Sequence, residues 1–272
     1  MKSWMWIGVI ASMGLIAEAG TLARFRTPLG DVDVELLDED KPVTVRNFLT
    51  YVQEGRYRDS FFHRWVPNFV VQGGGFMVRH RGTTNSVFDF VPTLPPIVNE
   101  YSAGRTYSNT YGTLAMARVG GQTNSASSQW FFNLKHNVEL DGVDGGFTVF
   151  GRVIRGTNVL NLFVAAPPAN NVFRVNLGSP LNELPVTSAR PTIGDLVFFD
   201  VTLLQVAVER GSDGGASISW NAESNLVHLV EYTRQFPPVW TSLIRTNGNG
   251  GRMTAKDPAS DPQRFYRVRS EP

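Results

Sequence analysis

Residues 61–76 read FFHRWVPNFVVQGGGF. A run with so many aromatic and branched apolar residues is typical of buried strands, and Pro67 divides it into two short ones. Arg64 lies among aromatic residues, where a buried charge is costly unless it has a partner or reaches water. Taken alone, the position favours a plain interpretation, in which the side chain extends along apolar surface to the solvent. The neighbouring segments decide whether it has a chemical role.

The overall composition is that of a globular protein. The chain has 272 residues, 42% of them hydrophobic and 18% charged, with a formal net charge of +1. This length allows one sizeable core and a small second domain. The near-neutral charge argues against nucleic acid as the main partner. The sequence has no cysteine, and its four histidines lack the spacing of a metal site, so we expect neither a metal nor a cofactor.

The first 19 residues have the pattern of an export signal. Lys2 supplies a positive charge, residues 4–16 are mostly apolar, and Ala17-Glu18-Ala19 gives small residues before a cut near Gly20. A membrane anchor is the alternative, but the apolar stretch is shorter than the roughly 18–20 residues that span a bilayer. We therefore expect an exported protein, periplasmic or secreted, with no membrane span after signal removal.

Residues 20–206 are predicted to form one mainly β domain. Residues 21–37 alternate polar and apolar positions around a Pro-Leu-Gly-Asp turn, which indicates a hairpin. A period near 3.6 follows, with Pro42 near its first turn and Gly55 just beyond its end, as expected of a helix. Strands are predicted within 113–119, 128–134 and 147–153, with a closing strand within 194–208. A short helix is predicted over 158–164. The rest is a long ordered loop over 80–112 and a connection over 165–193. Short strands with two distant helices favour an antiparallel barrel or sandwich over repeated βαβ units.

The last part of the chain differs in composition and in hydrophobic pattern. Residues 207–216 are rich in glycine and charge, which predicts a linker. Residues 217–272 contain short alternating runs between proline and Asn-Gly turns, so we expect a small all-β domain of four or five strands. The sequence does not indicate a partner for it.

The groups nearest to Arg64 do not form the pattern of a hydrolase or of a phosphate-binding loop. His63 with Asp59 and Ser60 could suggest a hydrolytic triad, but no G-x-S-x-G turn is present and sequence neighbours rarely form one. His63 is better interpreted as a packing residue, and a secreted hydrolase is the weakest interpretation. The glycines at 73–75 lack the lysine and helix pattern of a phosphate-binding loop.

Four segments give the chain a family resemblance. FHRWVPNFVVQGG, GTLAMAR, SSQWFFNL and LDG followed by FTVFGRV occur in that order. Together they resemble the cyclophilin family of peptidyl-prolyl isomerases, and more the exported bacterial members than the eukaryotic cytosolic ones. The resemblance implies a closed eight-stranded antiparallel barrel capped by two helices. It also implies an enzyme that isomerises X-Pro bonds in unfolded or extended polypeptides without a cofactor.

The resemblance also assigns the site. Arg64 matches the catalytic arginine, and Met116 matches the methionine of the proline pocket. The substrate-binding residues implied in this way are Phe69, Gln72, Met116, Ala117, Arg118, Gln129, Phe131, Leu140 and Phe147. A non-catalytic module that uses the same groove to bind proline segments, or to act as a folding scaffold, is the alternative.

Some positions depart from the family pattern. Glu139 stands where cyclosporin-sensitive members carry tryptophan, so we expect weak cyclosporin binding. Arg118 stands for an asparagine, and Phe147 for a histidine, that are common in eukaryotic members. Trp65, Asn68 and Val70 also differ, and they could reshape the mouth of the pocket.

Overall fold

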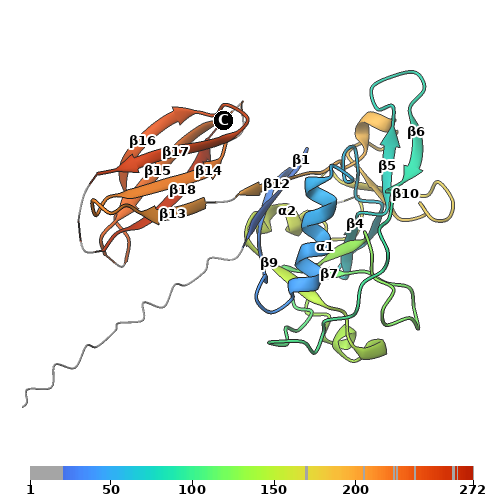
Figure 1. Ribbon diagram of the computed structural model, residues 1–272. Coiled ribbons are helices and arrows are strands. Elements are labelled where there is room, and N and C mark those ends of the chain that lie inside the picture. The colour runs from blue at the N-terminus through green and yellow to red at the C-terminus, as the bar shows by residue number, and fades with distance from the viewer. Residues whose placement is uncertain are drawn as a thin grey trace, which may run out of the picture.

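Figure 1 shows the computed structural model. It describes residues 21–271 apart from 169–170, 205, 223, 225, 236, 259–260 and 262. The predicted signal at residues 1–19 lies outside the described part. Within the described part, no helix is both long and apolar enough to cross a bilayer.

The first part of the chain folds into a curled antiparallel sheet of eight strands. Their order is β12-β1-β2-β9-β7-β8-β4-β3. The strands are β1 (Leu22–Thr27), β2 (Gly30–Leu36), β3 (Arg64–Val66), β4 (Val70–Gly73), β7 (Thr113–Met116), β8 (Trp130–Asn133), β9 (Val149–Arg155) and β12 (Asp200–Leu204). This arrangement confirms the predicted mainly β fold with an eight-stranded antiparallel sheet.

The two ends of the sheet are joined by irregular backbone. β12 and β3 are the terminal strands of the order. The segment before β3 bonds to the segment before β12, because Phe62 N donates to Val197 O at 3.0 Å and Phe199 N donates to Ser60 O at 3.0 Å. Two loop segments therefore link the ends of the curled sheet, and the described strands form no β3–β12 ladder.

Two helices accompany the sheet. α1 (Pro42–Gln53) buries Val45, Phe48 and Tyr51, as its apolar period requires. The carboxylate of Glu100 accepts hydrogen bonds from Thr44 N and Thr44 Oγ1, both at 2.7 Å, and so holds the start of the helix. α2 (Thr157–Asn161) is shorter than predicted. Both predicted helices are present.

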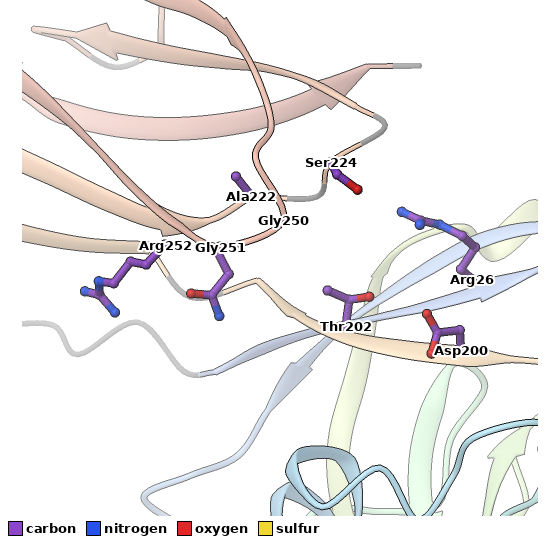
Figure 2. Close-up of a pocket in the computed structure, with 9 residues that line it drawn as sticks. Arg26, Asp200, Thr202, Ala222, Ser224, Gly250, Gly251 and Arg252 are labelled. Carbon is purple, nitrogen blue, oxygen red and sulfur yellow. The ribbon is translucent and has the colours of Figure 1, made fainter.

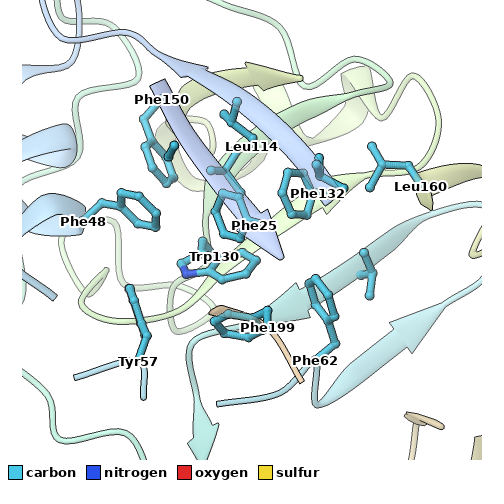
Figure 3. Close-up of a cluster of buried hydrophobic side chains, with 14 of the residues drawn as sticks. Phe25, Phe48, Tyr57, Phe62, Leu114, Trp130, Phe132, Phe150, Leu160 and Phe199 are labelled. Carbon is cyan, nitrogen blue, oxygen red and sulfur yellow. The ribbon is translucent and has the colours of Figure 1, made fainter. Parts of the chain in front are cut away.

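The core is built largely of aromatic rings, as Figure 3 shows. Phe25 makes edge contacts with Trp130 and Phe132, whose ring centroids lie 5.0 and 5.2 Å away. Side chains alternate across each strand, so Trp130 and Phe132 point into the core while Phe131 lies in a separate outer cluster. Burying each such side chain contributes roughly 1.5–3 kcal/mol. The same alternation positions the site on the outer face.

Two hairpins include strands that were not predicted. β5 (Phe76–Arg79) pairs with β6 (Val87–Phe90), and β10 (Phe173–Val175) pairs with β11 (Leu184–Val186). β6 lies inside the predicted 80–112 loop, and both β10 and β11 lie inside the predicted 165–193 connection. These strands are too short to show a clear period of two, and β11 also contains Pro185. Three 3-10 turns, η1 (Val138–Asp141), η2 (Val143–Gly145) and η3 (Ile193–Asp195), complete this part.

Two three-stranded sheets form the C-terminal module, here defined as residues 206–271. The sheets are β13-β14-β17 and β16-β15-β18. Ile218, Trp220 and Val230 lie in its core. The strands are β13 (Val206–Arg210), β14 (Ala216–Asn221), β15 (Val227–Thr233), β16 (Thr241–Asn247), β17 (Arg252–Asp257) and β18 (Phe265–Glu271). Five of these strands, β14 to β18, fall in the range predicted for a small β domain of four or five strands, and β13 precedes it.

The predicted linker over 207–216 is wrong. Residues 207–210 belong to β13, which pairs with β14, and Gly211 N donates to Gly215 O at 2.8 Å in the turn between them. The glycines and charges of this stretch come from a tight hairpin turn and an exposed strand, not from a flexible connection. The closing strand was likewise predicted too long, because Val206 already belongs to the C-terminal module.

Candidate active site

A slot lies on the outer face of the sheet. Its volume is about 190 Å³, and its lining comes from β3, β4, the segments that flank β7 and β9, β8 and η1. The lining residues are Arg64, Phe69, Val70, Gln72, Ala117, Arg118, Phe131, Leu140 and Phe147. The fold therefore brings together eight of the ten residues that the sequence assigned to the site.

Arg64 and Gln72 are placed by strand register. Arg64 on β3 lies directly opposite Gln72 on β4, so the two side chains share one face of the sheet. Trp65, the next residue, points to the other face and is fully buried in the core. The alternation explains why an arginine stands between aromatic residues, because it lies on the outer face while its neighbour fills the interior.

The side chain of Arg64 makes one hydrogen bond among the described residues. Its Nε donates to Glu183 Oε2 at 2.9 Å. The side chain is 38% exposed, so its guanidinium group reaches both the slot and solvent. Arg64 thus combines access to water with a place in the lining of the slot.

Gln72 is held by a second glutamine. Its Nε2 donates to Gln129 Oε1 at 2.7 Å. Gln129 is not part of the lining, and it therefore supports the slot through Gln72. The bond orients the amide of Gln72 beside Arg64.

The wall opposite the polar pair is apolar. Phe131 and Val70 are 4% and 2% exposed, and Phe147 lies edge-on to Phe131 with a centroid separation of 5.9 Å. Phe69 and Leu140 are partly buried against the same outer cluster. Such a surface suits a compact apolar ring and excludes water from it.

The prediction that Met116 lines the pocket is wrong. Met116 is 2% exposed and belongs to the main core, together with Leu114 two residues before it. Ala115 and Ala117 lie on the outer side, because successive residues of a strand face opposite sides. Val70 fills the outer face instead. Sequence reasoning noted Val70 only as a departure, although its spacing of two residues from Gln72 was the signal that could have placed it.

Arg118 forms part of the wall as a packed cation. Its guanidinium carbon lies 4.3 Å from the centre of the Phe147 ring, and its Nη2 donates to Val143 O at 2.6 Å. Burial lowers the pKa of Arg118, while the charge of Asp144 acts in the opposite direction. Arg118 thereby fixes the aromatic edge of the slot.

His63 is a buried packing residue and not part of a hydrolytic triad. Its ring lies 5.0 Å from that of Phe76. Burial lowers the pKa of His63 to about 4, so the imidazole is neutral near pH 7. Neither His63 Nδ1 nor Ser60 Oγ has a hydrogen-bond partner, so no nucleophile–base pair is formed.

A second, larger cavity lies apart from the slot (Figure 2). Its volume is about 450 Å³, and it is lined on one side by residues of β1 and β12 and on the other by strand ends and loops of the C-terminal module. None of the predicted site residues lines it. Within the described residues, no group of three histidine, aspartate or glutamate side chains could hold a metal ion.

The fold and the slot define a β-barrel protein with an arginine beside an apolar pocket. Residues 22–178 match the family described as cyclophilin type peptidyl-prolyl cis-trans isomerase/CLD. The chain therefore belongs to the cyclophilin-type peptidyl-prolyl cis-trans isomerases, and this family assigns it to that class of enzyme.

Curated relatives agree with this assignment. A peptidyl-prolyl cis-trans isomerase of Acinetobacter baylyi is 39% identical over 153 residues, which cover 56% of this chain and 76% of the relative. Peptidyl-prolyl cis-trans isomerase B of Escherichia coli is 37% identical over 52% of this chain and 82% of its own length. A crystal structure of a Cryptosporidium parvum cyclophilin type isomerase has a TM-score of 0.47 and 21% identity, covering 67% of this chain and 96% of that one.

Proposed function

We propose that Arg64 catalyses the isomerisation of X-Pro bonds held in the slot. The observation that carries this proposal is that Arg64 lies opposite Gln72 and lines the same slot as Phe131 and Leu140. A cation, an amide and an apolar wall thus surround one small space.

The chemistry needs no covalent step. A peptide bond resists rotation with a barrier of about 18–20 kcal/mol, because the nitrogen lone pair is conjugated with the carbonyl group. Twisting the amide ends the conjugation and leaves the lone pair on the prolyl nitrogen. A guanidinium group directed at that nitrogen, or at the rotating carbonyl, stabilises the twisted form more than either planar form. The Arg64 group is suited to this role.

Arg64 cannot supply all of the rate enhancement. A turnover near 10³ per second corresponds to a barrier of roughly 13 kcal/mol, so the site has to remove about 5–7 kcal/mol. One charge-assisted hydrogen bond contributes only about 1.5–3 kcal/mol. The remainder comes from a preorganised, partly dry site, in which Phe69, Phe131 and Leu140 hold the proline ring and Gln72 holds the flanking peptide.

The substrates we propose are unfolded or extended polypeptides that contain proline, met outside the cytoplasm. The exposed slot suits an extended chain better than a folded surface, and the export pattern at residues 1–19 is the basis for an exported, periplasmic or secreted location. No cofactor takes part in the proposed reaction. The same slot without turnover would instead act as a non-catalytic binding module.

The test is a peptide isomerisation assay on the full-length chain. We expect the protein to accelerate cis–trans exchange of a proline tetrapeptide, observed by exchange NMR, and the Arg64→Ala variant to lose most of that acceleration. Binding of the peptide without exchange would contradict catalysis and identify the binding module. Equal acceleration by the variant would remove Arg64 from the mechanism.

A further inference from the structure

We propose that Glu183 is a positioning residue for Arg64, and that the β10–β11 hairpin is therefore a functional part of the site. The inference rests on the proposed catalytic role of Arg64. Glu183 lies immediately before β11, outside residues 22–178 that match the family. No sequence motif assigned it a role.

Two contacts tie Glu183 to β3. Its carboxylate accepts the hydrogen bond from Arg64 Nε at 2.9 Å. Its backbone carbonyl accepts a hydrogen bond from Trp65 N at 2.7 Å. One residue thus holds both the catalytic side chain and the strand that carries it.

Arg174 on β10 supports the carboxylate from the other side. Its Nη1 lies 3.8 Å from Glu183 Oε1 and donates to Trp65 O at 3.4 Å. The backbone N–H and C=O groups of Trp65 are therefore both hydrogen-bonded to residues of the hairpin region. Because Glu183 lies between two arginines, its carboxylate has one favoured position.

The hairpin itself is firmly anchored. Leu184 and Val186, the residues that follow Glu183 on β11, are fully buried in a cluster with Phe61. A side chain on such a support loses less freedom when it makes a contact than one on a loose loop. Glu183 is 26% exposed, so the carboxylate lies at the boundary between the hairpin and the solvent.

The geometry of the ion pair leaves the reactive end of Arg64 available. The hydrogen bond to Glu183 uses Nε, whereas a guanidinium group presents further donors on its two terminal nitrogens. An unpaired arginine with this exposure would sample several rotamers, and its field is weakened by water. Orientation therefore outweighs the partial neutralisation of its charge, and we expect loss of Glu183 to reduce turnover.

The experiment compares five full-length variants with the wild type. Glu183→Gln keeps the shape without the charge, and Glu183→Ala removes both. Glu35→Gln is the matched control, because Glu35 also pairs with an arginine, Arg152 at 2.6 Å, and its side chain is 27% exposed. Arg64→Ala and its combination with Glu183→Gln complete a double-mutant cycle. The readouts are kcat and KM for a proline tetrapeptide, and the NMR signal of Arg64 Nε–Hε.

If the inference holds, Glu183→Gln lowers kcat about two- to fivefold, which is the effect expected when a partly exposed ion pair is lost. KM stays nearly constant. Glu183→Ala has at least that effect, and Glu35→Gln has none. The Arg64 Nε–Hε signal shifts in both Glu183 variants, and Glu183→Gln has no effect when Arg64 is absent. An unchanged or higher kcat overturns the inference, as does an equal loss in the Arg64→Ala background. An inactive wild type would instead refute the proposed function.

Discussion

Gln72 lies directly opposite Arg64 on the neighbouring strand and donates a hydrogen bond to Gln129, so a row of three polar residues runs from β3 across β4 to the residue before β8. The row stands against the apolar wall formed by Phe131 and Leu140. A cation held this way is suited to act on an amide without exchanging a proton with it.

The arginine is the first point to test. We expect Arg64→Ala to lower kcat/KM about ten- to a hundredfold, the loss of one charge-assisted hydrogen bond in the twisted state. Arg152→Ala is the control, because that arginine also pairs with a glutamate but lies 63% exposed outside the slot. Circular dichroism should show both variants folded. A similar loss in the two variants would contradict a specific role for Arg64.

The glutamine pair should behave as one unit. Gln129→Ala removes the acceptor for Gln72 Nε2, so we expect a smaller loss of kcat/KM than with Gln72→Ala, about twofold to fivefold. Because Gln129 acts through Gln72, the double variant should be no worse than Gln72→Ala alone. Additive losses would mean that Gln129 touches the substrate by itself.

Two apolar residues on opposite faces of the sheet should affect different properties, one the stability and the other the activity. Met116→Ala should lower the free energy of unfolding by about 2–5 kcal/mol, because it leaves a cavity in the core. Its kcat/KM, measured where the protein is folded, should change little. Phe131→Leu should instead lower kcat/KM about tenfold, because the slot loses an aromatic surface. Urea unfolding and the peptide assay separate these outcomes, and a large activity loss in Met116→Ala alone would reverse the assignment of faces.

The buried histidine predicts how stability depends on pH. The pKa of His63 falls from 6.5 to about 4 because of burial, and the charge of Arg64 lowers it further, while the hydrogen bond with Gln129 acts against both. Between pH 6.5 and about 4, His63 therefore binds a proton in the unfolded chain but not in the folded one. As pH falls through this window, the free energy of unfolding should decrease by up to about 1.4 kcal/mol per pH unit.

Urea unfolding at several pH values measures that slope. His63→Gln should reduce it between pH 6.5 and 4. His136→Gln serves as the control because His136 is an exposed histidine. An equal slope in the wild type and His63→Gln would mean that other groups cause the pH dependence.

Strong periodic patterns made much of the fold predictable. The hairpin of β1 and β2 and the helix α1 follow from clear periods of two and of 3.6 residues, with proline and glycine at the expected boundaries. The β10–β11 hairpin was missed because each strand has three residues and one contains Pro185. Short strands depend on tertiary contacts that no local pattern records.

The site was predictable where motif and strand alternation agree. Arg64, Gln72 and Phe131 lie where the motif suggested. Met116 was placed by motif alone, although alternation puts it inside with Leu114. Glu183 is 119 residues from Arg64 in the chain, so only the folded structure shows that they meet.

The adjacency of β12 and β13 has a practical consequence for anyone who shortens this chain. β12 ends at Leu204 and is a terminal strand of the eight-stranded sheet, while β13 begins at Val206. A truncation that isolates the isomerase must therefore cut beside a strand with one open edge, and open edges recruit other chains into aggregates. Solubility problems in such a fragment would reflect the place of the cut and not a defect of the slot.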